Sequence, residues 1–229
     1  MIMNTLKHFF CFISIFFAVS TCFAQDDTKA STKQDNFSVQ FAQCYATFKY
    51  MDSDGNKDMN LISDINFCYG ASYTKEISHG IFLRPEIGYK NYGATSYLNT
   101  QKLKWSLHYL DANLSLGYNL KIGKIEPGIF VSYYCSYLYK AEQNIGVDSY
   151  DMIKNKIIET NDYGINIGAR LQYLFSANTG FFIEYRKCFG LNQLEKNYIS
   201  GSNQKMYNRA SSIHFGLSFK IDKKENKLS

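Results

Sequence analysis

The sequence predicts an all-β protein, an eight-stranded antiparallel up-and-down transmembrane β-barrel. Three observations favour this fold: eight long segments in which apolar and polar residues alternate, connections that are alternately short and long, and a polar face that combines charges with glycines. Alternation with a period of two is typical of a strand whose two faces meet different surroundings. Such strands cross a membrane only as a closed barrel, because lipid cannot satisfy an open sheet edge.

The eight segments are longer than the strands of most soluble domains. Each spans about 9–14 residues, whereas a tilted membrane-spanning strand needs about 9–11 and soluble strands most often have about 5–6. The chain has 19 Tyr and 18 Phe but only 2 Pro, and this composition favours strands. The predicted strands are 37–49, 64–75, 81–91, 108–120, 125–138, 162–174, 181–191 and 208–221.

The connections between these segments alternate in length. Three short turns, at 76–80, 121–124 and 176–180, each contain Gly. Outer-membrane barrels have short periplasmic turns and longer external loops, so the alternation favours a membrane barrel. The predicted external loops are 50–63, 92–107, 139–161 and 192–207.

The face opposite the apolar one carries ten charged residues, five acidic and five basic, together with many glycines. In a membrane barrel this face fills the interior, which is just wide enough for side chains when there are eight strands. Ions enclosed there must pair, so we expect an interior charge network and no wide pore. Its members are Arg84, Glu86, Lys90, Asp111, Glu126, Arg170, Glu184 and Arg186, and Asp64 and Lys220 complete the ten.

Two other functions remain open on the sequence alone. A soluble periplasmic lipocalin-like carrier of a small apolar ligand would show the same alternation, with its apolar face inside and its charges in solvent. Ser212 and His214 lie on one face of the last segment, beside Glu184 and Arg186 of its neighbour. A hydroxyl, an imidazole and an acid could form an outer-membrane lipid hydrolase. A filled polar interior explains the same residues without catalysis, so we expect no enzyme.

The N-terminal segment has the features of a signal peptide. Lys7 and His8 precede an apolar run, and the run ends in Cys22-Phe23-Ala24, with small residues where signal peptidase cleaves. The run is too short for a transmembrane helix, which needs about 20 residues. The predicted organisation is a signal peptide at 1–24, a flexible leader at 25–35, a β-barrel domain at 36–221 and a charged tail at 222–229.

Charge and cysteine spacing exclude some classes of protein. The formal net charge of +5 becomes +4 without Lys7 of the signal peptide, which is too mild to indicate nucleic-acid binding. Cys44 and Cys68 lie on the same side of neighbouring strands, and we expect them opposite each other, as a disulfide or as two packed thiols. The cysteines match no metal motif, and the acidic run 52–58 departs from the EF-hand pattern. We therefore expect no metal and no cofactor.

Five stretches resemble a known family. They are 109–114, 124–130, 163–170, 182–186 and the sequence Leu83-Arg-Pro-Glu-Ile-Gly-Tyr89, which fits the strand pattern x-P-E-φ-x-Y. Over about residues 37–221 the chain resembles the PorT-like outer-membrane β-barrel family of Bacteroidetes. The resemblance implies an eight-stranded barrel in the outer membrane. Most members have no known activity, and the founding protein is linked to protein secretion and gliding systems, so a structural, a secretion-accessory and a loop-mediated binding role all remain open.

The end of the last predicted strand resembles the signal that the barrel-assembly machinery reads. His214, Gly216, Phe219 and Ile221 fit polar-x-Gly-x-x-φ-x-φ, although a charged tail follows. We therefore expect a protein of the cell outer membrane whose partners are outer-membrane lipid and the barrel-assembly machinery. The sequence identifies no protein partner.

Overall fold

The structure is a computed structural model that describes residues 35–51, 54–56, 61–98, 101–196 and 205–221. The predicted signal peptide, the predicted tail and the predicted leader up to residue 34 lie outside these ranges and stay predictions. Asp35, which the sequence analysis assigned to the leader, is the first residue of a strand. Among the described residues, no helix is long and apolar enough to cross a membrane.

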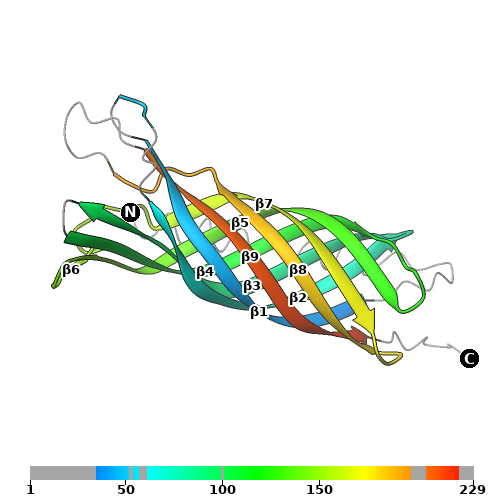
Figure 1. The fold of residues 1–229 in the computed structure, drawn as a ribbon. Helices are drawn as coiled ribbons and strands as arrows, with labels where there is room; N and C mark the ends of the chain where they lie inside the picture. The colour runs from blue at the N-terminus through cyan, green and yellow to red at the C-terminus, as the bar shows by residue number, and fades with distance from the viewer. Residues whose placement is uncertain (1–34, 52–53, 57–60, 99–100, 197–204, 222–229) are drawn as a thin grey trace, which may run out of the picture. The chain divides into compact units, whose positions relative to one another are not determined.

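The strands form one antiparallel sheet that closes into a ring (Figure 1). The sheet order is β4-β3-β2-β1-β9-β8-β7-β5-β6, and an additional pairing of β4 with β5 closes it. The short β6 pairs with the end of β5, so eight strands build the ring and the predicted fold class is confirmed. The strands are β1 (Asp35–Met51), β2 (Ile62–Ser78), β3 (Ile81–Leu98), β4 (Gln101–Asn119), β5 (Ile125–Ile145), β6 (Asp148–Asp151), β7 (Asn161–Leu174), β8 (Thr179–Gly190) and β9 (Lys205–Ile221).

The strands are staggered around the ring. One can walk once around the ring from each residue to its paired partner on the next strand. A walk that starts at Glu76 of β2 returns to the same strand at Asn66, ten residues from the start. A stagger of this kind fixes the tilt of the strands, and eight strands leave an interior that side chains can fill. The inward-facing residues of opposite strands can therefore touch across the barrel.

All eight predicted strands are present, but two of the predicted loops are wrong in extent. β3 continues to Leu98 and pairs with β4 from Gln101 onward, so most of the predicted loop 92–107 is a paired hairpin. β5 continues to Ile145 and pairs with β6, so the predicted loop 139–161 also begins as strand. These extensions were missed because apolar residues no longer fall on the same face of the strand there.

The two faces of the barrel exchange polarity along its length, as β1 illustrates. Phe37 and Phe41 are exposed on its outward face while Gln40 is buried, whereas further along Ala46 and Phe48 are the buried residues. We call the part next to the short turns, with apolar side chains outside, the turn half. The loop half, with apolar side chains inside, comprises residues 44–51 of β1, 92–98 of β3, 101–109 of β4, 137–162 around β5 and β6, 188–196, and 205–210 of β9.

The change of polarity falls in β4 where the sequence pattern breaks. Tyr109 is fully buried, and Leu110 beside it is half exposed. In the sequence, the apolar residues change phase between Leu107 and Leu110, and the structure gives the cause. β4 keeps its alternation, but its apolar residues move from the outward to the inward face. At this level β5 has one extra residue, because His108 pairs with Lys140 while Tyr109 pairs with Leu138.

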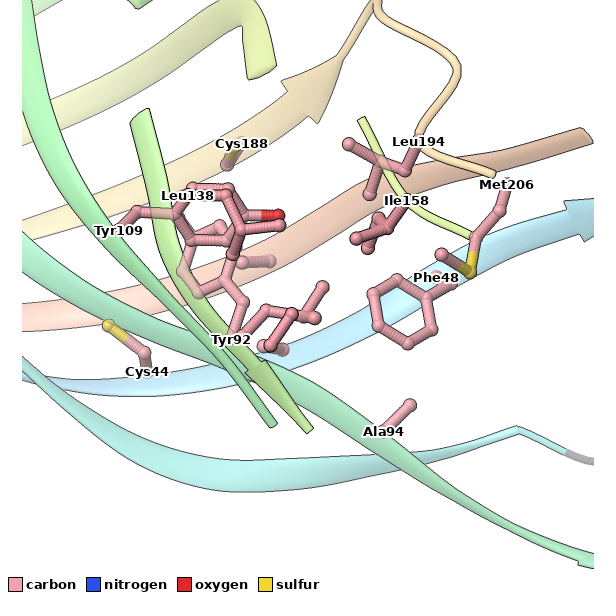
Figure 2. Close-up of a cluster of buried hydrophobic side chains, with 14 of the residues drawn as sticks. Cys44, Phe48, Tyr92, Ala94, Tyr109, Leu138, Ile158, Cys188, Leu194 and Met206 are labelled. Carbon is pink, nitrogen blue, oxygen red and sulfur yellow. The ribbon is translucent and has the colours of Figure 1, made fainter. Parts of the chain in front are cut away.

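The interior of the loop half is a packed apolar core (Figure 2). Tyr109 and Leu138 are fully buried there. Ile158 and Leu194, which lie in connecting segments, pack into the same cluster. The backbone N–H of Leu194 donates to the carbonyl of Met206 at 2.8 Å, which ties one connecting segment to β9. The core therefore continues from the strands into the segments beyond them.

Candidate functional site

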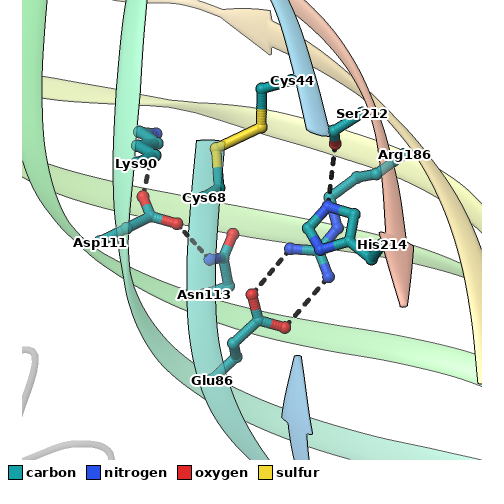
Figure 3. Close-up of a disulfide and its surroundings, with 9 residues drawn as sticks. All are labelled: Cys44, Cys68, Glu86, Lys90, Asp111, Asn113, Arg186, Ser212 and His214. Carbon is teal, nitrogen blue, oxygen red and sulfur yellow. Dashed lines mark hydrogen bonds and ion pairs between the residues drawn. A yellow bond between two sulfur atoms is a disulfide. The ribbon is translucent and has the colours of Figure 1, made fainter. Parts of the chain in front are cut away.

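Arg186 of β8 joins two glutamates inside the turn half, and Figure 3 shows its contact with one of them, Glu86. Its guanidinium donates to Glu86 Oε1 at 2.8 Å and to Glu86 Oε2 at 3.0 Å. It also donates to Glu184 from Nε at 3.0 Å and from Nη2. Arg84 donates to the other oxygen of Glu184 at 2.7 Å. Because β3 and β8 lie on opposite sides of the ring, these bonds cross the barrel.

The local pattern of the strands explains this arrangement. Residues two apart point to the same face of a strand, so Arg84 and Glu86 of β3 face Glu184 and Arg186 of β8. All four are buried, with exposed fractions of 0–6%, and their formal charges cancel. A buried ion is tolerated when it is paired and hydrogen-bonded. Each of the four has a partner of opposite charge.

A second ion pair lies nearer the loop half. Lys90 Nζ is 2.9 Å from Asp111 Oδ1, and it lies 3.9 Å from the ring centroid of Tyr134 and 4.9 Å from that of Tyr92. Asp111 also accepts hydrogen bonds from Asn113 and Ser136. Aromatic faces attract an ammonium group, so the pair occupies the boundary between the ionic interior and the apolar core.

The remaining two predicted residues lie toward the short turns. Arg170 stacks on Phe182, with Cζ 3.5 Å from the ring centroid, and donates to Gln172 Oε1 at 2.9 Å. Gln172 in turn donates to Glu126 Oε2 at 3.0 Å, and Lys220 Nζ is 3.8 Å from Glu126 Oε1. A neutral amide therefore links Arg170 to Glu126.

The structure thus places the eight predicted charges in the interior, in three groups. Seven are buried and Asp111 is partly buried. Asp162 was not predicted from the sequence, yet it is fully buried and accepts hydrogen bonds from Asn208 and Tyr134. Its position at the start of the predicted strand 162–174, in phase with Arg170, was the available signal.

Cys44 and Cys68 form a disulfide between β1 and β2 (Figure 3). Their Cα atoms are 6.6 Å apart. The expectation that the two residues lie directly opposite each other is wrong, because Cys44 pairs with Asn66 and Cys68 with Ala42. The hairpin register is shifted by two positions, and the bond therefore runs diagonally between the strands.

Ser212 and His214 meet inside the barrel, but no carboxylate of the described residues binds the imidazole to complete a catalytic triad. Ser212 Oγ is 2.9 Å from His214 Nε2. His214 Nδ1 is buried and has no hydrogen-bond partner among the described residues, whereas a catalytic base needs a group there to orient it. The carboxylate of Glu184, the nearest candidate by register, is bound by Arg84 and Arg186.

The space left beside these groups is small. A cavity of ≈ 30 Å³ lies among Gln40, Lys90 and His214, which is room for about one or two water molecules. No group of three His, Cys, Asp or Glu side chains in the described part of the chain could hold a metal ion. The acidic run 52–58 lies largely outside the described residues.

The residues of the predicted assembly signal lie along β9. His214 is buried inside the barrel, and Phe219 and Ile221 are exposed on the outward face near the end of the strand. Gly216 faces inward, where an added Cβ would lie 2.4 Å from the ring of Phe182. These positions do not test recognition by the assembly machinery, which stays a prediction.

The chain is similar to known outer-membrane barrels. A family model described as the outer membrane protein beta-barrel domain matches residues 23–196, and no curated protein matches the chain. The outer membrane protein OprG from Pseudomonas aeruginosa has 12% identity and a TM-score of 0.50, covering 86% of this chain and 100% of its own. Neisserial surface protein A has 16% identity and a TM-score of 0.47, covering 81% and 97%. The protease OmpT from Escherichia coli has 8% identity and a TM-score of 0.48, covering 85% and 100%.

Proposed function

Because the chain belongs to the outer membrane protein beta-barrel domain family and is an outer-membrane protein, we propose that it is a closed, non-conducting and non-enzymatic scaffold that holds its loop half outside the cell as a binding platform. The short turns join β2 to β3, β4 to β5 and β7 to β8, and short turns are periplasmic in this class. The loop half then projects from the outer leaflet.

The observation that carries this proposal is the closure of the interior at two levels. In the turn half, Arg186, Glu86 and Glu184 cross the barrel. In the loop half, Tyr109 and Leu138 are fully buried in the apolar core. A barrel that conducts needs a continuous polar path, and these two layers interrupt it with side chains in contact. An eight-stranded barrel is of the size that side chains fill.

The platform consists of the extended hairpins. The β3–β4 hairpin presents Tyr97, and the β5–β6 hairpin presents Val147 and Tyr150, all exposed. Exposed apolar and aromatic side chains on a rigid hairpin are typical of an interaction surface. The PorT-like resemblance supports a secretion-accessory role as the finer form of this proposal. Unchanged protein secretion after deletion of the gene would remove that finer form alone.

The alternatives have less support. A lipocalin-like carrier would have its apolar face inside the turn half, where the structure has ions, and Ile87 and Ile167 are exposed on the outward face instead. A hydrolase would need an orienting acid at His214 Nδ1, and that atom has no partner in the described part of the chain. We therefore assign neither function.

The test has two measurements on the full-length protein. The purified barrel, inserted into planar lipid bilayers, should give no steady conductance, and a stable open channel would contradict the closed interior. In intact cells, a Val147→Cys variant in a Cys135→Ser background should react with a membrane-impermeant maleimide. The matched variant Ala177→Cys, on the short turn after β7, should react only after permeabilisation. The reverse pattern would overturn the proposed orientation.

A further inference from the structure

Two cations lie on the outward face of the barrel with no acidic partner among the described residues. Lys187 of β8 is exposed and pairs in the ladder with Ile167 of β7 and Ser211 of β9. Arg209 lies two residues from Ser211 on the same face of β9. No described carboxylate lies within 4.0 Å of either charge, although other cations near the loops, such as Lys104 and Lys140, have one.

The two charges are gathered around one aromatic ring. Lys187 Nζ is 5.9 Å from the ring centroid of Phe189, and Arg209 Cζ is 5.4 Å from the same centroid. Arg209 is held by hydrogen bonds from Nη1 to the carbonyls of Gly190, at 2.9 Å, and Asn208, at 3.1 Å. Within the described part of the chain, Nη2 and Nε have no hydrogen-bond partner and remain as donors for a ligand. A guanidinium fixed in this way suits a phosphate, which accepts several hydrogen bonds at once.

The charges stand at the upper margin of the apolar belt. On β9 the outward residues are apolar from Ile213 to Ile221 and polar at Ser211 and Arg209. Lys187 reaches further into the belt, since its neighbour Ile167 is an exposed apolar residue. A lysine within the belt is costly when it is unpaired, and the cost falls toward the interface. An anionic group from the lipid would compensate it.

An apolar groove begins directly below these charges. Tyr185 and Ile213, which pair with each other one step below Lys187 and Ser211, line one end of a groove of ≈ 690 Å³. The groove continues past Ala169 and Ile129 to Leu120, near the short turn after β4. Its lining is almost wholly apolar, and its upper part, next to the cations, is where an acyl chain would lie if its headgroup were at the interface.

We propose that Lys187, Arg209 and Ser211 bind the phosphate of an outer-leaflet lipid headgroup, and that an acyl chain of the same lipid lies in the groove of Tyr185, Ile213, Ala169 and Ile129. The occupant is a phosphorylated lipid, because the site combines two cations at the interface with an apolar channel below them. The inference rests on the proposed orientation, in which the loop half faces outward.

The test measures binding of lipid A to the full-length barrel in phosphatidylcholine nanodiscs, by native mass spectrometry and by titration. The unmodified protein should retain phosphorylated lipid A and lose most of it when the lipid is dephosphorylated. The double variant Lys187→Gln/Arg209→Gln should bind about tenfold or more weakly. Ala169→Phe, which fills the groove, should also weaken binding.

The matched control is Lys140→Gln, which removes a loop-end cation that already pairs with Glu142 and should leave lipid A affinity within about twofold. Heat-modifiable migration verifies that every variant has folded. Equal binding of phosphorylated and dephosphorylated lipid, equal binding by the double variant, or displacement of lipid A by inorganic phosphate alone would overturn the proposal. If these outcomes occur while Val147→Cys is labelled from outside, the lipid site fails and the proposed orientation stands.

Discussion

The turn half and the loop half are built from the same strands, yet their polarity is reversed. In the turn half, Ile87 is 62% exposed while Glu184 is fully buried; in the loop half, Leu138 is fully buried while Lys140 is exposed. Each half places its apolar side chains where water is absent. In the turn half this is the outward face, which meets lipid, and in the loop half, above the membrane, it is the interior of the barrel. A period of two therefore identifies a strand, and the solvent on each side of the strand decides which face becomes the core.

The halves also differ in what holds them together. The interior of the turn half depends on ions whose charges must balance, whereas the loop half depends on close packing of apolar side chains. Loss of one ion leaves its partner unpaired in a confined space, and loss of one buried methyl group leaves a cavity. Substitutions in the two interiors should therefore destabilise the protein for different reasons.

The largest expected effect is the loss of Arg186. Arg186→Met leaves Glu86 without its ion pair in a buried position, and breaking such a pair costs about 3–5 kcal/mol of the free energy of unfolding. The double variant Arg186→Met/Glu86→Met keeps the pair of Arg84 and Glu184 and restores charge balance, so it should recover much of that loss. Urea unfolding in lipid vesicles measures both. Equal destabilisation of the single and the double variant would show that charge balance is not what stabilises the turn half.

A cavity in the apolar core should come next. Leu138→Ala removes a fully buried side chain and should cost about 2–5 kcal/mol in the same unfolding experiment. The control is Leu116→Ala, on the outward face of the turn half, where lipid fills the space that the side chain leaves. If the two variants lost the same stability, the loop half would have no packed core.

A lysine introduced on the outward face of β3 should have a different cost in the turn half and in the loop half. Ile87→Lys puts a lysine in the apolar belt and should cost about 2–4 kcal/mol, whereas Tyr97→Lys, on the same face of β3 but in the loop half, should cost about 0–1 kcal/mol. Both residues are more than half exposed, so exposure alone predicts no difference between them. An equal loss of stability at both positions would mean that the turn half and the loop half of this face meet the same solvent.

The smallest effect should come from Glu195, in the segment between β8 and β9. Burial raises the pKa of its carboxyl group, and Oε2 has no hydrogen-bond partner among the described residues. The unfolded segment therefore ionises at a lower pH than the folded one, and stability is lost as the pH rises through the ordinary range of a glutamate toward the raised pKa. Glu195→Gln should remove this pH dependence and stabilise the segment at neutral pH by about 1 kcal/mol.

Hydrogen exchange of the amides in 191–196, measured at two pH values, reports how the ionisation of Glu195 changes the opening of this segment. The amide exchange rates, corrected for their intrinsic pH dependence, should show the segment opening more often at neutral pH in the unmodified protein. The Glu195→Gln variant should show the same opening at both pH values. A pH-dependent difference that persists in the variant would assign it to another group.

In the turn half, the sequence was sufficient for the strands and for which side chains point inward, because both follow from alternation within each strand. Arg84 and Glu86 were assigned to the interior for that reason. The partners could not be predicted, since Arg84 meets Glu184, a hundred residues away, only through the closure and stagger of the ring. The diagonal position of Cys44 and Cys68 was missed because it depends on the hairpin register, which the alternation does not determine.

In the loop half, the alternation led to a wrong prediction of where the strands end. Tyr92 and Leu107 were assigned to a loop because their apolar side chains fall out of phase with those of the preceding strand, and both are buried in the core. The exchange of the apolar and polar faces, which caused the extended hairpins to be assigned as loops, indicates the point at which a strand leaves lipid. A search for phase reversals within long alternating segments would have found them.

The most direct test compares Ile87 and Tyr97, which share one face of β3. A nitroxide label placed at either position, in a background without free cysteines and in lipid bilayers, reports whether its surroundings are lipid or water. We expect the label at 87 to collide with oxygen and to be shielded from a water-soluble nickel complex, and the label at 97 to show the opposite. Equal accessibility of the two labels to the nickel complex would contradict it.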